Sequence, residues 1–100
     1  MKIVAVTACP TGIAHTYMAA EQLQRTAEAM GHEIKVETQG AMGIENELSQ
    51  EEIDAADVAI FAVDIAVENA ERFDGVRRVE VPVQDASKDP GAILAGLQAN

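Results

Sequence analysis

The sequence is poor in cysteine and in aromatic residues. Cys9 is the only cysteine, and one tyrosine and two phenylalanines are the only aromatic side chains. A lone cysteine cannot form a disulfide within the chain, which is typical of a protein from a reducing compartment. The hydrophobic content of 48% therefore comes mostly from small and aliphatic residues, a composition that indicates a globular chain. One hundred residues predict a single domain, residues 1–100, with a modest core.

Basic residues and long apolar runs are also scarce. The chain has 7 basic and 17 acidic residues, a formal net charge of −10. Nucleic acids and anionic lipids attract basic patches, so we expect neither as a partner. The longest apolar run covers residues 58–63, whereas a membrane-spanning helix needs about 20 residues. The apolar stretch after Met1 is too short for a secretory signal. We therefore expect a cytoplasmic protein without direct membrane insertion.

Strand-like and helix-like segments alternate along the chain. Short runs rich in valine and isoleucine predict strands, and apolar residues spaced by three and four predict helices. The expected strands are 2–7, 32–38, 56–63 and 77–83, and the expected helices are 13–30, 50–55, 66–73 and 89–98. Residues 39–43 are expected to form a loop, and Pro82 limits the last strand to an edge. This order predicts an α/β fold: an open four-stranded parallel sheet with helices on both faces, in three layers.

The loop after the first expected strand is the candidate functional site. Cys9 lies at the carboxyl end of that strand, and a run of small residues leads from it into the first helix. Ligands of open α/β sheets bind at this edge, where the 38–43 loop and Asp64 are also expected. A helix N-terminus directs N–H groups at an anion and favours a thiolate, the nucleophilic form of cysteine. We expect Cys9 to be the catalytic nucleophile, and the phosphate-binding loop to comprise Pro10, Thr11, Gly12, Ile13, Ala14, His15 and Thr16.

Four uses of such a cysteine are open at this point. A cysteine phosphatase has an arginine six residues after the cysteine as a clamp for the phosphate, but this chain has His15 there. A phosphoryl carrier needs the thiolate and the N–H donors without a strong cation clamp. Redox chemistry is disfavoured because no second cysteine forms a C-x-x-C pair. A regulatory domain that docks a partner without catalysis is the remaining alternative.

Three stretches of the sequence resemble a known family. Residues 9–21 read CPTGIAHTYMAAE, residues 36–40 read VETQG and residues 43–46 read GIEN. They closely resemble the fructose-type enzyme IIB of the bacterial phosphoenolpyruvate-dependent sugar phosphotransferase system, and the resemblance covers nearly the whole chain. It implies that the phosphohistidine of enzyme IIA donates to Cys9. The phosphocysteine then donates to a fructose-class sugar bound by the membrane enzyme IIC during uptake, at the inner face of the membrane. The resemblance implies neither cofactor nor metal.

Several side chains keep two interpretations. His15 either orients the loop near the phosphate or points outward from the first helical turn. Gln39 and Gly40 either line the site or form an ordinary turn, which is the interpretation we favour. Asp64 either tunes the site or caps the following turn. The three arginines at 72, 77 and 78 are scarce cations in an acidic chain, so they are better candidates for a partner contact than any one glutamate.

Overall fold

The computed structural model describes residues 1–9, 13–40 and 43–98, apart from the side chains of Ile13 and Gln98. Ten elements follow one another along the chain. They are β1 (Lys2–Ala8), α1 (Ile13–Ala29), β2 (Glu33–Gly40), β3 (Gly43–Glu45), α2 (Gln50–Asp54), β4 (Val58–Val63), the 3₁₀ turn η1 (Ala70–Phe73), β5 (Arg78–Val81), α3 (Val83–Lys88) and α4 (Pro90–Gln98). Each of the four expected strands is present, so the α/β class is confirmed.

The described strands form one sheet in the order β3-β2-β1-β4-β5. The four expected strands run parallel, as predicted. The expected strand count was wrong, because β3 adds a fifth strand antiparallel to β2. The expectation of a loop at 39–43 failed for the same reason. β2 continues to Gly40, and Gly43 pairs with it at a φ of +89°, a conformation that glycine adopts without steric cost.

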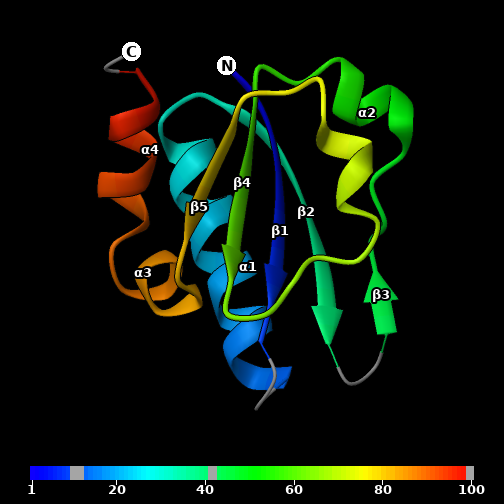
Figure 1. Cartoon of the computed structure of the whole chain (residues 1–100). Coiled ribbons are helices and arrows are strands. Elements are labelled where there is room, and N and C mark those ends of the chain that lie inside the picture. The colour runs from blue at the N-terminus through cyan, green and yellow to red at the C-terminus, as the bar shows by residue number, and fades with distance from the viewer. Residues whose placement is uncertain (10–12, 41–42, 99–100) are drawn as a thin grey trace.

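Helices cover both faces of the sheet, which confirms the three layers. Figure 1 shows α1 behind the sheet with α3 and α4 beside it, and α2 on the other side. Alternate residues of β1 serve the two faces: Ile3 and Ala5 pack in the cluster with α1, whereas Val4 and Val6 pack in the cluster with α2. At β1 both faces of the sheet are therefore buried, as expected for a central parallel strand.

Helix α1 ends where the sequence predicts. Gly31 has a φ of +85°, its N–H donates to Glu28 O at 3.0 Å, and the N–H of His32 donates to Ala27 O at 2.9 Å. These two bonds form a Schellman motif, which satisfies carbonyls that the helix leaves open. The chain then turns directly into β2.

The second half of the chain differs more from expectation. The helix expected at 66–73 is reduced to the turn η1, and the last strand ends at Val81. Pro82 does not belong to the strand. At a φ of −65° it is the N-cap of α3, a helix that the sequence analysis missed. Strand β5 does lie at an edge of the sheet, and α4 matches the expected last helix.

No helix in the described part of the chain combines the length and the apolar character that crossing a membrane requires.

Candidate functional site

Cys9 follows the last residue of β1, a strand with neighbours on both sides in the sheet. Its side chain is buried, with 7% of the residue exposed, and it packs in the core cluster on the α1 face. Helix α1 begins four residues later, at Ile13. The predicted loop residues Pro10, Thr11 and Gly12 lie outside the described residues.

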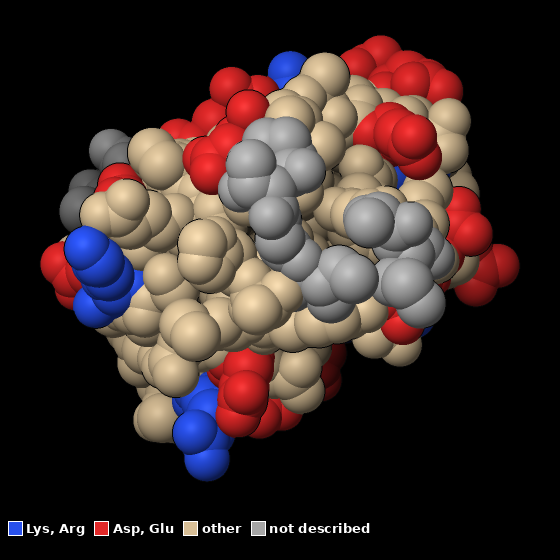
Figure 2. Space-filling model, turned by 90° about the horizontal axis from the view of Figure 1, so that it is seen from below, with Lys and Arg blue, Asp and Glu red and all other residues tan. Residues whose placement is uncertain are grey.

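Two surface depressions meet at Cys9. The first, of about 290 Å³, also includes residues of the β2 end, of β3 and of the segment after β4: Gln39, Gly40, Gly43, Ile65, Ala66 and Glu68. The second, of about 540 Å³, also includes residues of α1, the β4 end and α3: His15, Met18, Asp64, Val83, Gln84, Ser87 and Lys88. Figure 2 views this end of the molecule, where a broad uncharged area lies beside the grey residues. The carboxyl edge of the sheet therefore carries the openings, as predicted.

The first turn of α1 places the remaining loop residues in different surroundings. Ala14 and His15 are exposed, and His15 lines the second depression. Thr16 is buried and lines neither of the two. Its carbonyl accepts a hydrogen bond of 3.1 Å from Thr7 Oγ1, which joins the end of β1 to the start of α1. The backbone N–H groups of this first turn have no partner within the helix and are suited to an anion.

Asp64 and Gln39 each line one of the two depressions. Asp64 lines the second depression, and its Oδ1 accepts a hydrogen bond of 3.2 Å from the N–H of Val83. It thus caps the distant helix α3 instead of the turn that follows it. Gln39 and Gly40 line the first depression with Cys9. The favoured interpretation of an ordinary turn was therefore wrong.

A buried ion pair behind the first depression was missed by the sequence analysis. Arg72 Nη1 and Nη2 each lie 3.0 Å from an oxygen of the Glu37 carboxylate, and the Glu37 side chain is fully buried. The Arg72 side chain is only 14% exposed. Arg72 is therefore a structural partner of Glu37, and little of its side chain is left exposed to contact a partner protein. One signal was available: a glutamate inside a strand covered on both faces needs a buried cation.

Hydrogen bonding decides the charge state of this pair. Burial alone would raise the pKa of the Glu37 carboxyl. The hydrogen bonds from Arg72, from the Leu48 N–H and from Gln39 outweigh burial and hold the pKa of Glu37 below its ordinary value. The hydrogen bond to Glu37 likewise raises the pKa of Arg72. Both groups stay ionised at neutral pH, and each needs the other.

The other two arginines also have partners within the chain. Arg77 Nη1 donates to Leu97 O at 3.2 Å. Arg78 lies over the ring of Phe61 at 5.1 Å and pairs with Glu80 at 3.8 Å. Among the described residues that line the two depressions, Lys88 is the only lysine or arginine. The bidentate arginine clamp of a cysteine phosphatase is therefore absent from these described linings.

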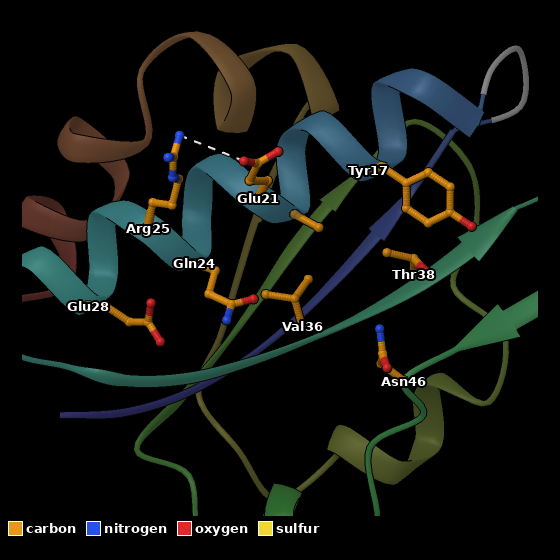
Figure 3. Close-up of a pocket in the computed structure, with 9 residues that line it drawn as sticks. Tyr17, Glu21, Gln24, Arg25, Glu28, Val36, Thr38 and Asn46 are labelled. Carbon is orange, nitrogen blue, oxygen red and sulfur yellow. Dashed lines mark ion pairs between the residues drawn. The ribbon is translucent and has the colours of Figure 1, made fainter.

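A third depression lies away from Cys9, between α1 and β2. It has about 310 Å³, and Figure 3 shows Tyr17 and Gln24 above Val36 and Thr38. The Tyr17 hydroxyl donates to the Glu45 carboxylate, so this side chain ties α1 to β3. Tyr17 is 39% exposed and does not belong to the core.

Metal binding finds no support in the described residues. Within 1–9, 13–40 and 43–98, no group of three or more histidine, cysteine, aspartate or glutamate side chains is arranged to hold a metal ion.

Comparison with known proteins decides the family. Residues 4–95 match the family model described as "PTS system, Lactose/Cellobiose specific IIB subunit". The "PTS system fructose-like EIIB component 2" of Escherichia coli K12 is 52% identical over 99 residues, which cover 99% of this chain and 93% of that protein. The chain belongs to the IIB family of the phosphotransferase system. IIB components are phosphotransferases of sugar-transport systems, so this chain is a phosphoryl-transfer protein.

Two further relatives show how the IIB domain is used and folded. The "Fructose-like PTS system EIIBC component" of Escherichia coli K12 is 47% identical over the whole of this chain, which matches 21% of that longer protein. Its name shows that a IIB domain there shares one polypeptide with a IIC domain. The solution structure of the enzyme IIB subunit of the PTS system from Escherichia coli K12 superposes with a TM-score of 0.92 and 41% identity, over 97% of this chain and 90% of that one. The family resemblance stated from the sequence is therefore confirmed.

Proposed function

We propose that Cys9 carries the phosphoryl group in this IIB domain, and that residues 1–100 act as one such domain. In this proposal the phosphohistidine of an enzyme IIA donates to Cys9. The phosphocysteine then donates to a fructose-class sugar that the membrane enzyme IIC binds, with the domain docked at the cytoplasmic face of the membrane. The loop residues Pro10, Thr11, Gly12, Ile13, Ala14, His15 and Thr16 hold the phosphate.

One observation carries the proposal: the only cysteine of the chain lies at the carboxyl edge of the sheet, between β1 and the start of α1, where two depressions meet. A phosphate on the sulfur would lie near the start of α1, where the first N–H groups have no partner within the helix. These donors compensate the negative charge that the phosphoryl group brings to an acidic chain.

Each transfer step is a displacement at phosphorus. In the first, the Cys9 thiolate attacks the phosphorus of the phosphohistidine; an S–P bond forms, the N–P bond breaks and the imidazole nitrogen takes a proton from solvent. In the second, a sugar hydroxyl oxygen attacks the same phosphorus; an O–P bond forms, the S–P bond breaks and the thiolate returns. The hydroxyl proton passes to a base on the side of the acceptor. Neither step needs a cofactor.

The names of the relatives support the fructose class of sugar. Two relatives at about 50% identity are named fructose-like, while the family model carries a lactose and cellobiose description. We favour the fructose class because identity at this level reflects closer kinship than a match to a family model. The fused IIC domain in one relative supports a membrane IIC as the partner.

Phosphorylation through a reconstituted relay tests the proposal. With phosphoenolpyruvate, the general relay proteins and an enzyme IIA, mass spectrometry should find one phosphate on Cys9. Neither Cys9→Ser nor Cys9→Ala should transfer phosphate to the sugar. Circular dichroism should show that both variants are folded. Sugar phosphorylation by the Cys9→Ala variant would refute the proposal. Hydrolysis of an aryl phosphate without any relay protein would instead favour a phosphatase, and docking without phosphate transfer would favour a regulatory domain.

A further inference from the structure

Gln39 lies beside Cys9 and uses both ends of its side-chain amide. In the sheet Gln39 is the register partner of Ala8, the residue before Cys9. It is 4% exposed. Its Nε2 donates to Glu37 Oε2 at 2.7 Å and to Glu68 O at 3.2 Å, and its Oε1 accepts from the Glu68 N–H at 2.9 Å. The amide therefore binds the N–H and the C=O of a single residue, as a neighbouring strand would.

The segment bound in this way forms the wall of the first depression opposite β2. Ile65, Ala66 and Glu68 line that depression together with Cys9. Residues 64–69 contain neither helix nor strand, so no ladder of backbone hydrogen bonds fixes them. Ile65 is 40% exposed and offers an apolar contact to a protein that docks at the first depression. The two bonds between Gln39 and Glu68 therefore join this wall directly to the strand next to β1 and Cys9.

The Glu37–Arg72 ion pair holds the side-chain amide of Gln39 in one orientation. Glu37 accepts one Nε2 hydrogen of Gln39, which sets the orientation of the amide. Arg72 also donates to three backbone carbonyls, those of Leu48 at 3.2 Å, Glu68 at 3.4 Å and Asn69 at 2.9 Å. The Glu37–Arg72 ion pair therefore connects three segments next to Gln39: β2, the loop before α2 and the loop after β4.

We infer that Gln39 is a positioning residue for phosphoryl transfer at Cys9: it holds the 65–68 wall, against which the phosphohistidine-bearing partner packs as it presents phosphorus to the sulfur. The inference rests on the proposed function of Cys9. Gln39 acts through the wall and not on the sulfur. Small misplacements of reacting groups slow in-line displacements severely, so a wall that moves weakens productive docking.

Two variants separate this role from a purely structural one. Gln39→Leu removes both amide groups, and Gln39→Glu keeps the size but loses the Nε2 donors. Gln39→Met replaces either variant if it does not fold. The control is Gln24→Leu, which removes an amide from the third depression, remote from Cys9.

Three measurements give the expected pattern. In both Gln39 variants the KM for ³²P-labelled phospho-IIA should rise about tenfold or more, while the control stays within about twofold. In Gln39→Leu, hydrogen exchange at the Glu68 amide should accelerate about tenfold, because its acceptor is lost. Gln39→Glu keeps an oxygen acceptor there, so its exchange should accelerate less. The rate of Cys9 alkylation by iodoacetamide should stay within about twofold of the wild-type rate, because the thiolate itself is unchanged.

Three results would overturn the inference, and the first two of them are distinct from failure of the proposed function. Transfer kinetics within twofold of wild type, despite faster exchange at Glu68, would show that the wall has no part in docking. Alkylation slowed in step with transfer would show that Gln39 acts on the sulfur. A wild-type chain that takes no phosphate from any IIA would contradict the proposed function itself, and with it this inference.

Discussion

Replacing Arg72 by methionine tests how much the buried ion pair contributes. The change keeps most of the side-chain length but leaves the Glu37 carboxylate buried without its cation. Removing one partner of a buried pair costs about 3–5 kcal/mol. Because 14% of the Arg72 side chain remains exposed, we expect the lower end, about 3 kcal/mol at pH 7. For a domain of this size that corresponds to a fall in Tm of about 12–24 °C.

Urea unfolding at 25 °C, followed by circular dichroism, measures this cost. The matched control is Arg25→Met, since Arg25 and Glu21 form an exposed pair at 3.7 Å, with side chains 71% and 64% exposed. Its loss should cost at most about 0.5 kcal/mol. The double variant Glu37→Leu with Arg72→Met should be more stable than Arg72→Met alone, because no unpaired charge stays buried. A cost for Arg72→Met below about 1 kcal/mol at pH 7 would refute the reasoning, as would strictly additive costs in the double variant.

Three further predictions concern stability. Folding lowers the pKa of Glu37 from its ordinary value of 4.5. The Glu37 carboxylate therefore stabilises the fold fully above pH 4.5, and this stabilisation is lost as the pH falls through the lower pKa of the folded state. The urea concentration at the unfolding midpoint should drop between about pH 5 and pH 2, and it should drop less steeply in Glu37→Gln. Phe73 is 1% exposed and packs edge-on against Phe61 at 4.9 Å, so Phe73→Ala should cost about 3–5 kcal/mol by urea unfolding, and a cost under about 1 kcal/mol would contradict this packing. Ser49 Oγ accepts from the N–H of Glu52 at 3.1 Å, so Ser49→Ala should cost about 1 kcal/mol, whereas Ser49→Asp should cost less.

The sequence predicted the elements whose signal is local. The apolar run of β4 and the helical spacing of α1 are each visible within one segment, and both elements lie within two residues of their expected bounds. β3 has three residues, too few for a periodic pattern, and depends on the positive φ of Gly43. Helix α3 was hidden because Pro82 was assigned to the strand before it. Short elements defined by a single backbone torsion leave little trace in a sequence.

The sequence pointed to Cys9 as the centre of the candidate site, but it did not show which residues surround Cys9. Cys9 stood out because it is alone and lies between a strand and a helix. The wall held by Gln39 was not visible, because the contacts that fix it join residues about 30 positions apart, as Gln39 and Glu68 do. Pairings across such a separation are set by the topology of the sheet. A sequence read segment by segment shows only that Glu37 and Arg72 each need a partner.

The two edge strands of the sheet affect whether copies of the domain associate with one another. β3 and β5 are short, with three and four residues, and Pro82 follows β5 with no N–H to offer. Where β3 ends, the uncovered part of β2 carries the exposed charged residues Glu33 and Lys35. Short, proline-flanked and charged margins resist the strand-to-strand association that leads to aggregation. Copies of the domain at high concentration are therefore expected to stay separate at both edges of the sheet.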